Sequence, residues 1–294
     1  MKLFRPGKVL WIVLILAGFL ALGVTYHFYD RGRPAPIPIK KKLYTGVTYR
    51  RMVRYAPHFR IAHVLTIDRR TPGLQLFVTP ADQAEEEPLL ARTTSEFTEE
   101  FDVQIAVNGD GFFPWWSRSL ADYYPHSGDP VTPNGLAASE GFIYSRGERL
   151  PPEPTLFISR RGELTFNRIP NRVQSAISGD RMIVLKGEPV PGLDPNELDP
   201  RTAVGLSKNG RWLYLVVIDG RQPFYSVGAS FSELADLMVE VGAYTAMNLD
   251  GGGSSTMVIE DADGQVQVVN SPIDSYIPGR ERPVANHLGI YLRK

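Results

Sequence analysis

The sequence predicts an α+β fold with a large, mostly β core, few helices and functional loops at the strand ends. Short runs rich in β-branched and aromatic residues, separated by proline and glycine, recur from residue 43 onward. One segment near residue 230 has the apolar spacing of a helix. Several apolar runs end in polar, glycine-rich loops, which places candidate functional groups at strand ends.

Composition excludes several classes of function. Apolar residues make up 43% of the 294 residues, which is enough for a sizeable core. Lysine plus arginine equals aspartate plus glutamate at 32 each, so bulk charge does not favour a nucleic-acid partner. The chain has no cysteine, which excludes thiolate catalysis, disulfides and cysteine-based zinc sites.

The N-terminus resembles a targeting segment. An apolar run, Val9 to Val24, follows the basic residues Lys2, Arg5 and Lys8, and no clean small-x-small cleavage site comes after it. We therefore expect residues 1–29 to be a transmembrane helix that acts as a signal anchor, with a cleaved signal peptide as the alternative. Long domains translocate largely regardless of charge, so we expect the remainder to be extracytoplasmic, periplasmic or at a bacterial cell surface.

The remainder divides into a linker and one domain. Residues 30–42 are rich in proline and basic side chains, which predicts a stiff linker. Residues 43–294 then form the functional domain. Apolar strands are expected at Val103–Val107, Trp212–Ile218 and Thr245–Leu249.

One helix is strongly indicated. Ser230 is expected to cap it, and Glu233, three residues further on, completes a capping box. Gly242 is expected to end it. The apolar residues of this segment fall on one helical face: Leu234, Leu237, Met238 and Val241.

A glycine-rich loop follows the strand Thr245–Leu249. Asp250 is followed by Gly251, Gly252, Gly253 and Ser254. Consecutive glycines cost conformational entropy and are tolerated where the backbone needs positive φ or a ligand comes close. Free N–H groups in such a turn form an anion-binding concavity, so the loop predicts a phosphate cradle with a carboxylate at its rim. The alternative is a plain hairpin turn.

Polar groups also follow other expected strands. If the strand ends meet, three carboxylates and up to three guanidiniums lie beside the cradle. Arginine binds phosphate as a planar fork, and carboxylates act as general acid and base or bind a divalent cation. This predicts cleavage of a phosphate-bearing substrate. The side chains concerned are Asn108, Asp110, Arg201, Asp219, Arg221, Asp250 and Arg282.

The loop from Pro114 to Pro133 contains several aromatic residues, which suits stacking against sugar rings. An apolar cluster that holds the loop in place is an equal alternative. The residues concerned are Trp115, Trp116, Tyr123, Tyr124 and His126.

Other chemistries fit less well. A nucleotide-binding Walker loop needs a lysine after its glycines, and none follows Gly253. A hydrolase elbow needs glycine two residues after its serine, and Thr256 stands there after Ser254. A dinucleotide fold needs spaced glycines before a helix, and no helical pattern follows these.

Six ordered motifs together resemble the phosphodiester glycosidase family, from about Val47 to Leu292. This resemblance implies a hydrolase of sugar-phosphate diesters with its site at these motifs. Through the bacterial members of the family it also implies a role in exopolysaccharide biosynthesis. The motifs are Ala106–Phe113, Ser178–Asp180, Arg201–Gly205, Val217–Arg221, Asn248–Thr256 and Arg282–Asn286, with the capped helix between the fourth and fifth.

The leading hypothesis is therefore a membrane-anchored, extracytoplasmic phosphodiester glycosidase acting on a cell-envelope glycan. Asp110 and Asp250 would divide the acid and base work, in an order that stays open, and Asp219 would orient Arg221 or a cation. The expected substrate-binding residues are Asn108, Arg201, Arg221, Gly251, Gly252, Gly253, Ser254 and Arg282. The alternative is a non-catalytic glycan-binding or assembly module of the same fold.

We expect no obligatory cofactor, with a divalent cation as an open alternative. The expected partners are a sugar-phosphate or glycan substrate and the membrane, and no nucleic acid.

Overall fold

A computed structural model describes residues 6–31, 33–82, 88–119, 121–147, 152–261 and 263–292. The chain divides into two compact units, Met1–Ala35 and Pro36–Lys294. The described part contains three α-helices and is otherwise dominated by strands, so the predicted α+β fold with a mostly β core is confirmed.

The N-terminal unit contains helix α1 (Pro6–Arg31). Within the described ranges, no helix of this protein is both long and apolar enough to cross a membrane. The predicted transmembrane anchor over residues 1–29 is thus not supported. Residues 1–5 of that segment, with Lys2 and Arg5, lie outside the described residues.

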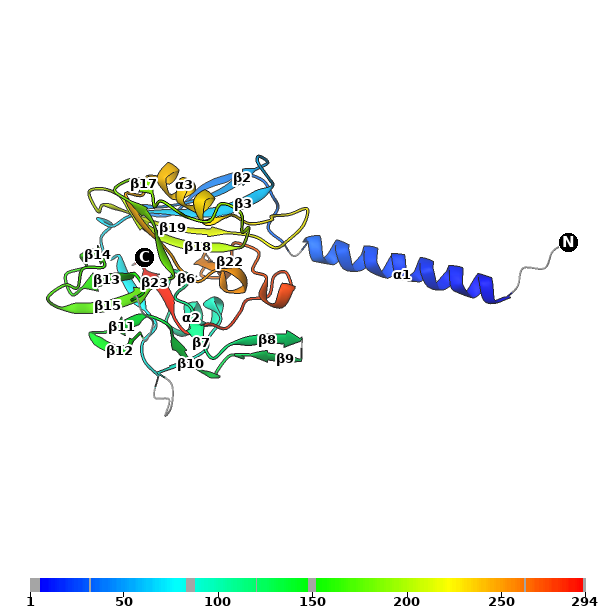
Figure 1. Cartoon of the computed structure of the whole chain (residues 1–294), viewed down its shortest axis with the longest axis horizontal. Helices are drawn as coiled ribbons and strands as arrows, with labels where there is room; N and C mark the ends of the chain where they lie inside the picture. Colours follow the sequence, from blue (N-terminus) through cyan, green and yellow to red (C-terminus); the bar gives the residue numbers. More distant parts are fainter. Residues whose placement is uncertain are drawn as a thin grey trace. The chain divides into compact units, whose positions relative to one another are not determined.

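The second unit is built from antiparallel sheets (Figure 1). Its largest sheet has eight strands in the order β1-β2-β3-β19-β18-β20-β16-β17, and a five-stranded sheet has the order β22-β21-β6-β23-β4. A second five-stranded sheet has the order β12-β11-β15-β13-β14, and smaller sheets have the orders β5-β10-β7 and β8-β9. The strands are β1 (Ile39–Tyr44), β2 (Val47–Arg54), β3 (Arg60–Asp68), β4 (Gln75–Val78), β5 (Leu89–Leu90), β6 (Ile105–Asn108), β7 (Phe112–Phe113), β8 (Trp116–Ser119), β9 (Asp122–Tyr124), β10 (Pro130–Pro133), β11 (Leu136–Ser139), β12 (Phe142–Arg146), β13 (Thr155–Ser159), β14 (Leu164–Phe166), β15 (Val173–Ser178), β16 (Arg181–Leu185), β17 (Glu188–Pro189), β18 (Arg201–Leu206), β19 (Trp212–Ile218), β20 (Thr245–Asn248), β21 (Met257–Glu260), β22 (Val266–Val268) and β23 (His287–Tyr291).

Two α-helices pack in this unit, α2 (Thr94–Glu100) and α3 (Phe231–Val241). The predicted capping box of α3 is present, because Ser230 accepts from the Glu233 amide while the Glu233 side chain accepts from the Ser230 amide. Gly242 ends the helix in the left-handed conformation, with φ of 107°.

The central strands of the eight-stranded sheet, β18 and β19, are buried on both faces, and α3 covers one face (Figure 1). Alternate residues of a strand point to opposite faces, so neighbours in β18 join different cores. Ala203 packs in the cluster that contains Leu234 of α3, whereas Val204 packs with Val107 and Leu288 of the five-stranded sheet. This stacking brings the ends of β6, β18 and β20 together.

The boundary of this unit falls at Pro36, inside the expected linker. Strand β1 begins at Ile39 and pairs with β2, with Ile39 opposite Arg51. Lysines are uncommon in strands, which is why the sequence did not indicate one here. Exposed lysines on an edge strand also discourage pairing with a second chain.

Candidate functional site

Two glycine-containing loops meet where β6 and β20 end. The Asp250 amide donates a hydrogen bond of 2.8 Å to the Gly109 carbonyl. The Asn108 side-chain amide donates to the Asp250 carbonyl, also at 2.8 Å. The loops that carry Asp110 and Asp250 therefore lie together, as the sequence led us to expect.

Asn108 is a structural link between three segments. Its side-chain oxygen accepts from the Thr202 hydroxyl at 2.8 Å and from the Thr256 amide at 3.2 Å, and the residue is fully buried. Since its amide nitrogen is engaged by Asp250, the geometry favours a positioning role over the predicted substrate contact.

Asp110 lies in a buried carboxyl pair. One of its carboxylate oxygens accepts from the Gly135 amide at 2.7 Å, and a side-chain hydrogen bond joins it to Glu153. Burial first, and then the Glu153 charge, raise the pKa of Asp110 well above its ordinary value, and the Asp250 charge adds to this. Two hydrogen-bonded carboxyl groups in such surroundings favour holding one proton between them.

The surroundings of Asp250 contain groups that raise its pKa and groups that lower it. Burial of the carboxyl group raises its pKa, and the nearby Asp180 charge adds to that rise. The Ser254 hydroxyl, the Arg282 charge and the Gly251 amide act in the opposite direction, and that amide donates at 3.0 Å. Asp250 is therefore better supported as a carboxylate than Asp110 is.

Two arginines flank the glycine loop. Arg221, which has a φ of 56°, is held by a two-pronged contact with Asp199 at 2.7 and 3.0 Å. Arg282 donates to Asp274 at 2.8 Å. Paired guanidiniums in fixed positions are suited to a phosphate.

The glycines admit these guanidiniums. A Cβ on Gly252 would lie 3.1 Å from both terminal nitrogens of Arg221, and one on Gly253 would lie 2.5 Å from a terminal nitrogen of Arg282. Gly252 also has a φ of 62°, a conformation that favours glycine. The close approach of the two arginines and the positive φ of Gly252 therefore explain these glycines without a bound ligand.

The predicted backbone cradle is partly occupied by internal bonds. The Gly252 amide donates to the Pro200 carbonyl at 2.9 Å, and the Ser254 amide donates to the Gly251 carbonyl at 3.3 Å within a short 3-10 turn, Gly252–Ser254. The guanidiniums beside this loop are therefore better placed than its amides to bind an anion.

Arg201 serves the scaffold. It is buried, and its guanidinium donates to the carbonyls of Ala229 and Glu197, each at 3.0 Å. The guanidinium also lies 3.8 Å from the ring centre of Phe231, and burial lowers the pKa of Arg201. These contacts leave it less suited than Arg221 or Arg282 to clamp a phosphate.

Asp219 is also internal. It is fully buried and accepts from the Ser271 amide at 2.7 Å and from Asn270 at 3.2 Å. His63 lies 2.9 Å from its other oxygen, and the Tyr49 hydroxyl lies 2.8 Å from the second ring nitrogen of His63. Arg221 is held by Asp199 and not by Asp219. The geometry therefore favours a structural role for Asp219.

The aromatic loop is held in place by its own ring contacts and keeps one exposed ring. Trp116 and Tyr124 stack with ring centres 4.7 Å apart and hold the β8–β9 hairpin, which projects from the body of the second unit (Figure 1). Trp115 is half exposed, and its ring centre lies 5.0 Å from the Arg282 guanidinium. Trp115 thus presents an exposed ring beside the Arg282 guanidinium.

A hollow of about 720 Å³ opens beside the carboxyl pair. Glu153, Asp180 and Arg181 line it, together with Gly135, whose amide binds Asp110. Glu153 was missed because it stands in the run Pro151–Pro154, outside any apolar strand pattern. In the ranges that the structure describes, no three histidine or acidic side chains gather closely enough to hold a metal ion.

Comparison with known proteins identifies the fold. The chain is similar to a zebrafish N-acetylglucosamine-1-phosphodiester alpha-N-acetylglucosaminidase catalytic domain, auto-inhibited by its pro-peptide, at 18% identity and a TM-score of 0.60, covering 88% of this chain and 85% of that one. A hypothetical protein from Synechocystis matches at 15% identity and a TM-score of 0.58. That match covers 88% of this chain and 64% of the Synechocystis chain, which is therefore the longer.

An exported-protein candidate from Burkholderia pseudomallei matches at 18% identity and a TM-score of 0.58, covering 82% of this chain and 76% of that one. No curated protein sequence matches significantly. The sequence model of the phosphodiester glycosidase family matches residues 101–291, which is more than half of the chain and includes both loops of the site. The resemblance seen in the sequence is thus confirmed, and the chain belongs to the phosphodiester glycosidase family.

Proposed function

We propose that this protein hydrolyses a sugar-phosphate diester by breaking the bond between the anomeric carbon and the phosphate oxygen. One observation supports this proposal most strongly. The carboxyl groups of Asp110 and Asp250 lie at the same glycine loop as the guanidiniums of Arg221 and Arg282. Membership of a hydrolase family supports the same reaction class.

The arginines suit the phosphate half of the substrate. As the bond between the anomeric carbon and the phosphate oxygen lengthens, negative charge grows on the phosphate, which leaves as a phosphate monoester. Arg221 and Arg282 are oriented by Asp199 and Asp274 and can stabilise that charge without reorganising.

The carboxyl groups suit the sugar half. Glycosidases of this kind need one protonated and one ionised carboxyl group at the anomeric centre. Asp110, whose pKa is raised by burial and by Glu153, is suited to supply the proton to the leaving oxygen. Asp250, supported by Ser254, Gly251 and the Arg282 charge, is suited to attack the anomeric carbon or to activate water.

Two observations support a glycan substrate outside the cytoplasm. Trp115 places an exposed ring beside Arg282, where a sugar face can stack. The Burkholderia neighbour is described as exported. We therefore propose a cell-envelope glycan or exopolysaccharide as the substrate class.

A screen with the purified full chain tests this proposal. Simple alkyl diesters of several sugar 1-phosphates are incubated with the wild type and with a double variant, Asp110→Asn with Asp250→Asn, and free sugar and phosphate monoester are quantified. We expect equal amounts of both products from at least one sugar, and loss of both in the double variant. Activity retained by the double variant would place the reaction elsewhere, and no hydrolysis of any diester would favour a glycan-binding module.

A further inference from the structure

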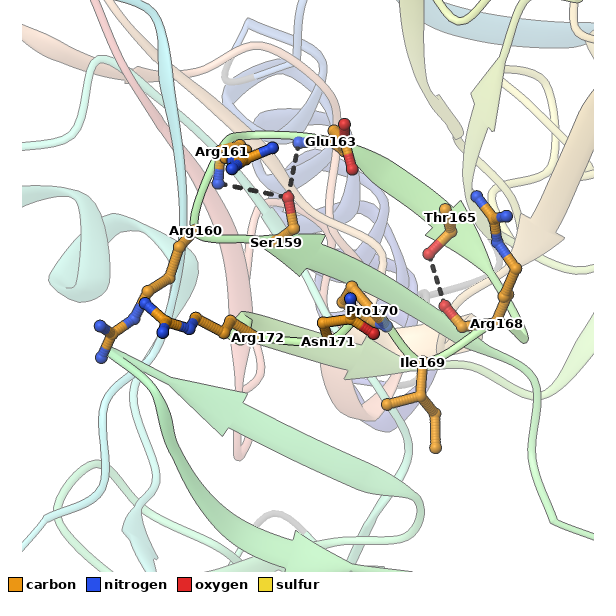
Figure 2. Close-up of a pocket in the computed structure, with 10 residues that line it drawn as sticks. All are labelled: Ser159, Arg160, Arg161, Glu163, Thr165, Arg168, Ile169, Pro170, Asn171 and Arg172. Atoms are coloured by element: carbon orange, nitrogen blue, oxygen red, sulfur yellow. Dashed lines mark hydrogen bonds between the residues drawn. The ribbon is translucent and has the colours of Figure 1, made fainter.

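A second hollow, of about 820 Å³, lies beside strands β13 and β14, and we name it the arginine groove (Figure 2). Four of its lining residues are exposed arginines within a single short segment of the chain. These residues are Arg160, Arg161, Arg168 and Arg172.

The charges of the arginine groove are not neutralised locally. No carboxylate in the described part of the chain forms an ion pair with any of the four arginines. Glu163 is the acidic residue that lines the groove, and its charge acts on Arg69. Since the whole chain has a formal charge of zero, this is a local concentration of positive charge.

Two of these arginines lie opposite each other, just beyond the ends of the neighbouring strands β13 and β15. The Arg160 amide donates to the Arg172 carbonyl at 3.2 Å, and Figure 2 shows both side chains extending in the same direction. Like charges on adjacent strands repel each other unless an anion binds both. Planar guanidiniums arranged in this way suit carboxylate or phosphate groups.

The arginine groove adjoins the hollow beside the carboxyl pair. Ile169 lines both hollows, and Glu153 lines the second of them. Ile169 is exposed, so a chain molecule whose end lies near Glu153 can extend over it towards the arginines.

We propose that the arginine groove binds an anionic segment of a glycan chain whose sugar-phosphate diester lies at Asp110 and Asp250. This inference rests on the proposed function and narrows its substrate class to acidic glycans. The described residues that line the groove include no aromatic ring, whereas sites for single-stranded nucleic acid use aromatic stacking. Ile169 is its one large aliphatic side chain, which is too little for insertion into a lipid surface.

Binding of labelled polygalacturonate oligomers to the full chain tests the groove. The test variant is Arg160→Gln with Arg172→Gln, and the control is Lys40→Gln with Lys41→Gln, which removes the same charge from exposed positions of β1. Neutral dextran, single-stranded DNA and vesicles of phosphatidylglycerol are measured in parallel. We expect the polygalacturonate Kd to rise about tenfold in the arginine variant and to change by less than about twofold in the lysine variant.

Hydrolysis of a small sugar-phosphate diester should be unchanged in both variants, because such a substrate does not reach the groove. Equal polygalacturonate affinity in the arginine variant and the wild type would overturn the proposal. Tighter binding of DNA or vesicles through the same arginines would overturn it in favour of that ligand. If no form hydrolyses the small diester while the affinity difference remains, the proposed reaction fails and the groove is a glycan-binding site alone.

Discussion

Gly109 and Asp250 are joined by a backbone hydrogen bond of 2.8 Å, in which Asp250 donates. This bond ties the loop that carries Asp110 to the loop that carries the three glycines. The two loops are close enough that the Asp250 charge contributes to the raised pKa of Asp110.

The first prediction concerns the boundary of the second unit. A chain of residues 36–294 should fold, whereas one that begins at residue 43 should melt at a lower temperature. The shorter chain lacks most of β1 and its pairing with β2, from Ile39 opposite Arg51 to Lys42 opposite Thr48. Equal melting temperatures in circular dichroism would show that β1 contributes nothing to the sheet.

The second prediction distinguishes the role of Gly253 from that of Gly252. Gly253→Ala introduces no positive-φ strain, but its Cβ would lie 2.5 Å from the Arg282 guanidinium, which must move. We expect little change in melting temperature and a loss of the thermal protection given by a sugar 1-phosphate.

Gly252→Ala is the matched control for that variant. Its φ of 62° makes alanine cost roughly 1–2 kcal/mol, so the melting temperature itself should fall. Full protection of Gly253→Ala by the ligand would show that Arg282 does not bind the phosphate.

The third prediction uses the pKa of Asp110, which burial and the Glu153 charge raise well above the ordinary value of an aspartate. Above that value the unfolded chain loses its proton first, so the Asp110 carboxyl makes the folded state less stable as the pH rises. Asp110→Asn should therefore have a higher melting temperature than the wild type at pH 7.

The advantage of Asp110→Asn should vanish below about pH 3, where the wild-type carboxyl is protonated in both the folded and the unfolded state. A variant less stable than the wild type at neutral pH would mean that Asp110 is a stabilising carboxylate. Calorimetry across this pH range distinguishes the two outcomes.

The fourth prediction concerns Asp250→Asn, which keeps the size of the side chain and removes its charge. Turnover of a sugar-phosphate diester should fall by roughly 10²–10⁴, because a general base or nucleophile is lost. The melting temperature should not fall, since the buried charge is also removed. A large loss of stability with turnover retained per folded molecule would make Asp250 a turn residue.

Local sequence patterns predicted much of this fold. Strand β19 and the capped helix α3 have the expected bounds because apolar periodicity and capping chemistry are local properties. The first strand was missed, since Lys40–Lys42 are poor strand formers and its pairing partner is supplied by β2.

The candidate site was predictable in its loops and less so in its contacts. Asp110 and Asp250 meet as expected, but Asp219 is enclosed by His63 and Ser271. Such partners depend on packing between strands distant in sequence. Glu153 lies in a segment without periodicity, so only the folded chain reveals its bond to Asp110.

The position of the broken bond distinguishes cleavage at the anomeric carbon from attack at phosphorus. The full chain is allowed to hydrolyse a sugar-phosphate diester in water labelled with oxygen-18, and both products are weighed by mass spectrometry. A glycosidase adds water at the anomeric carbon, so we predict the label in the released sugar and none in the phosphate monoester. Label found in the phosphate monoester would contradict this account, because attack would then have occurred at phosphorus.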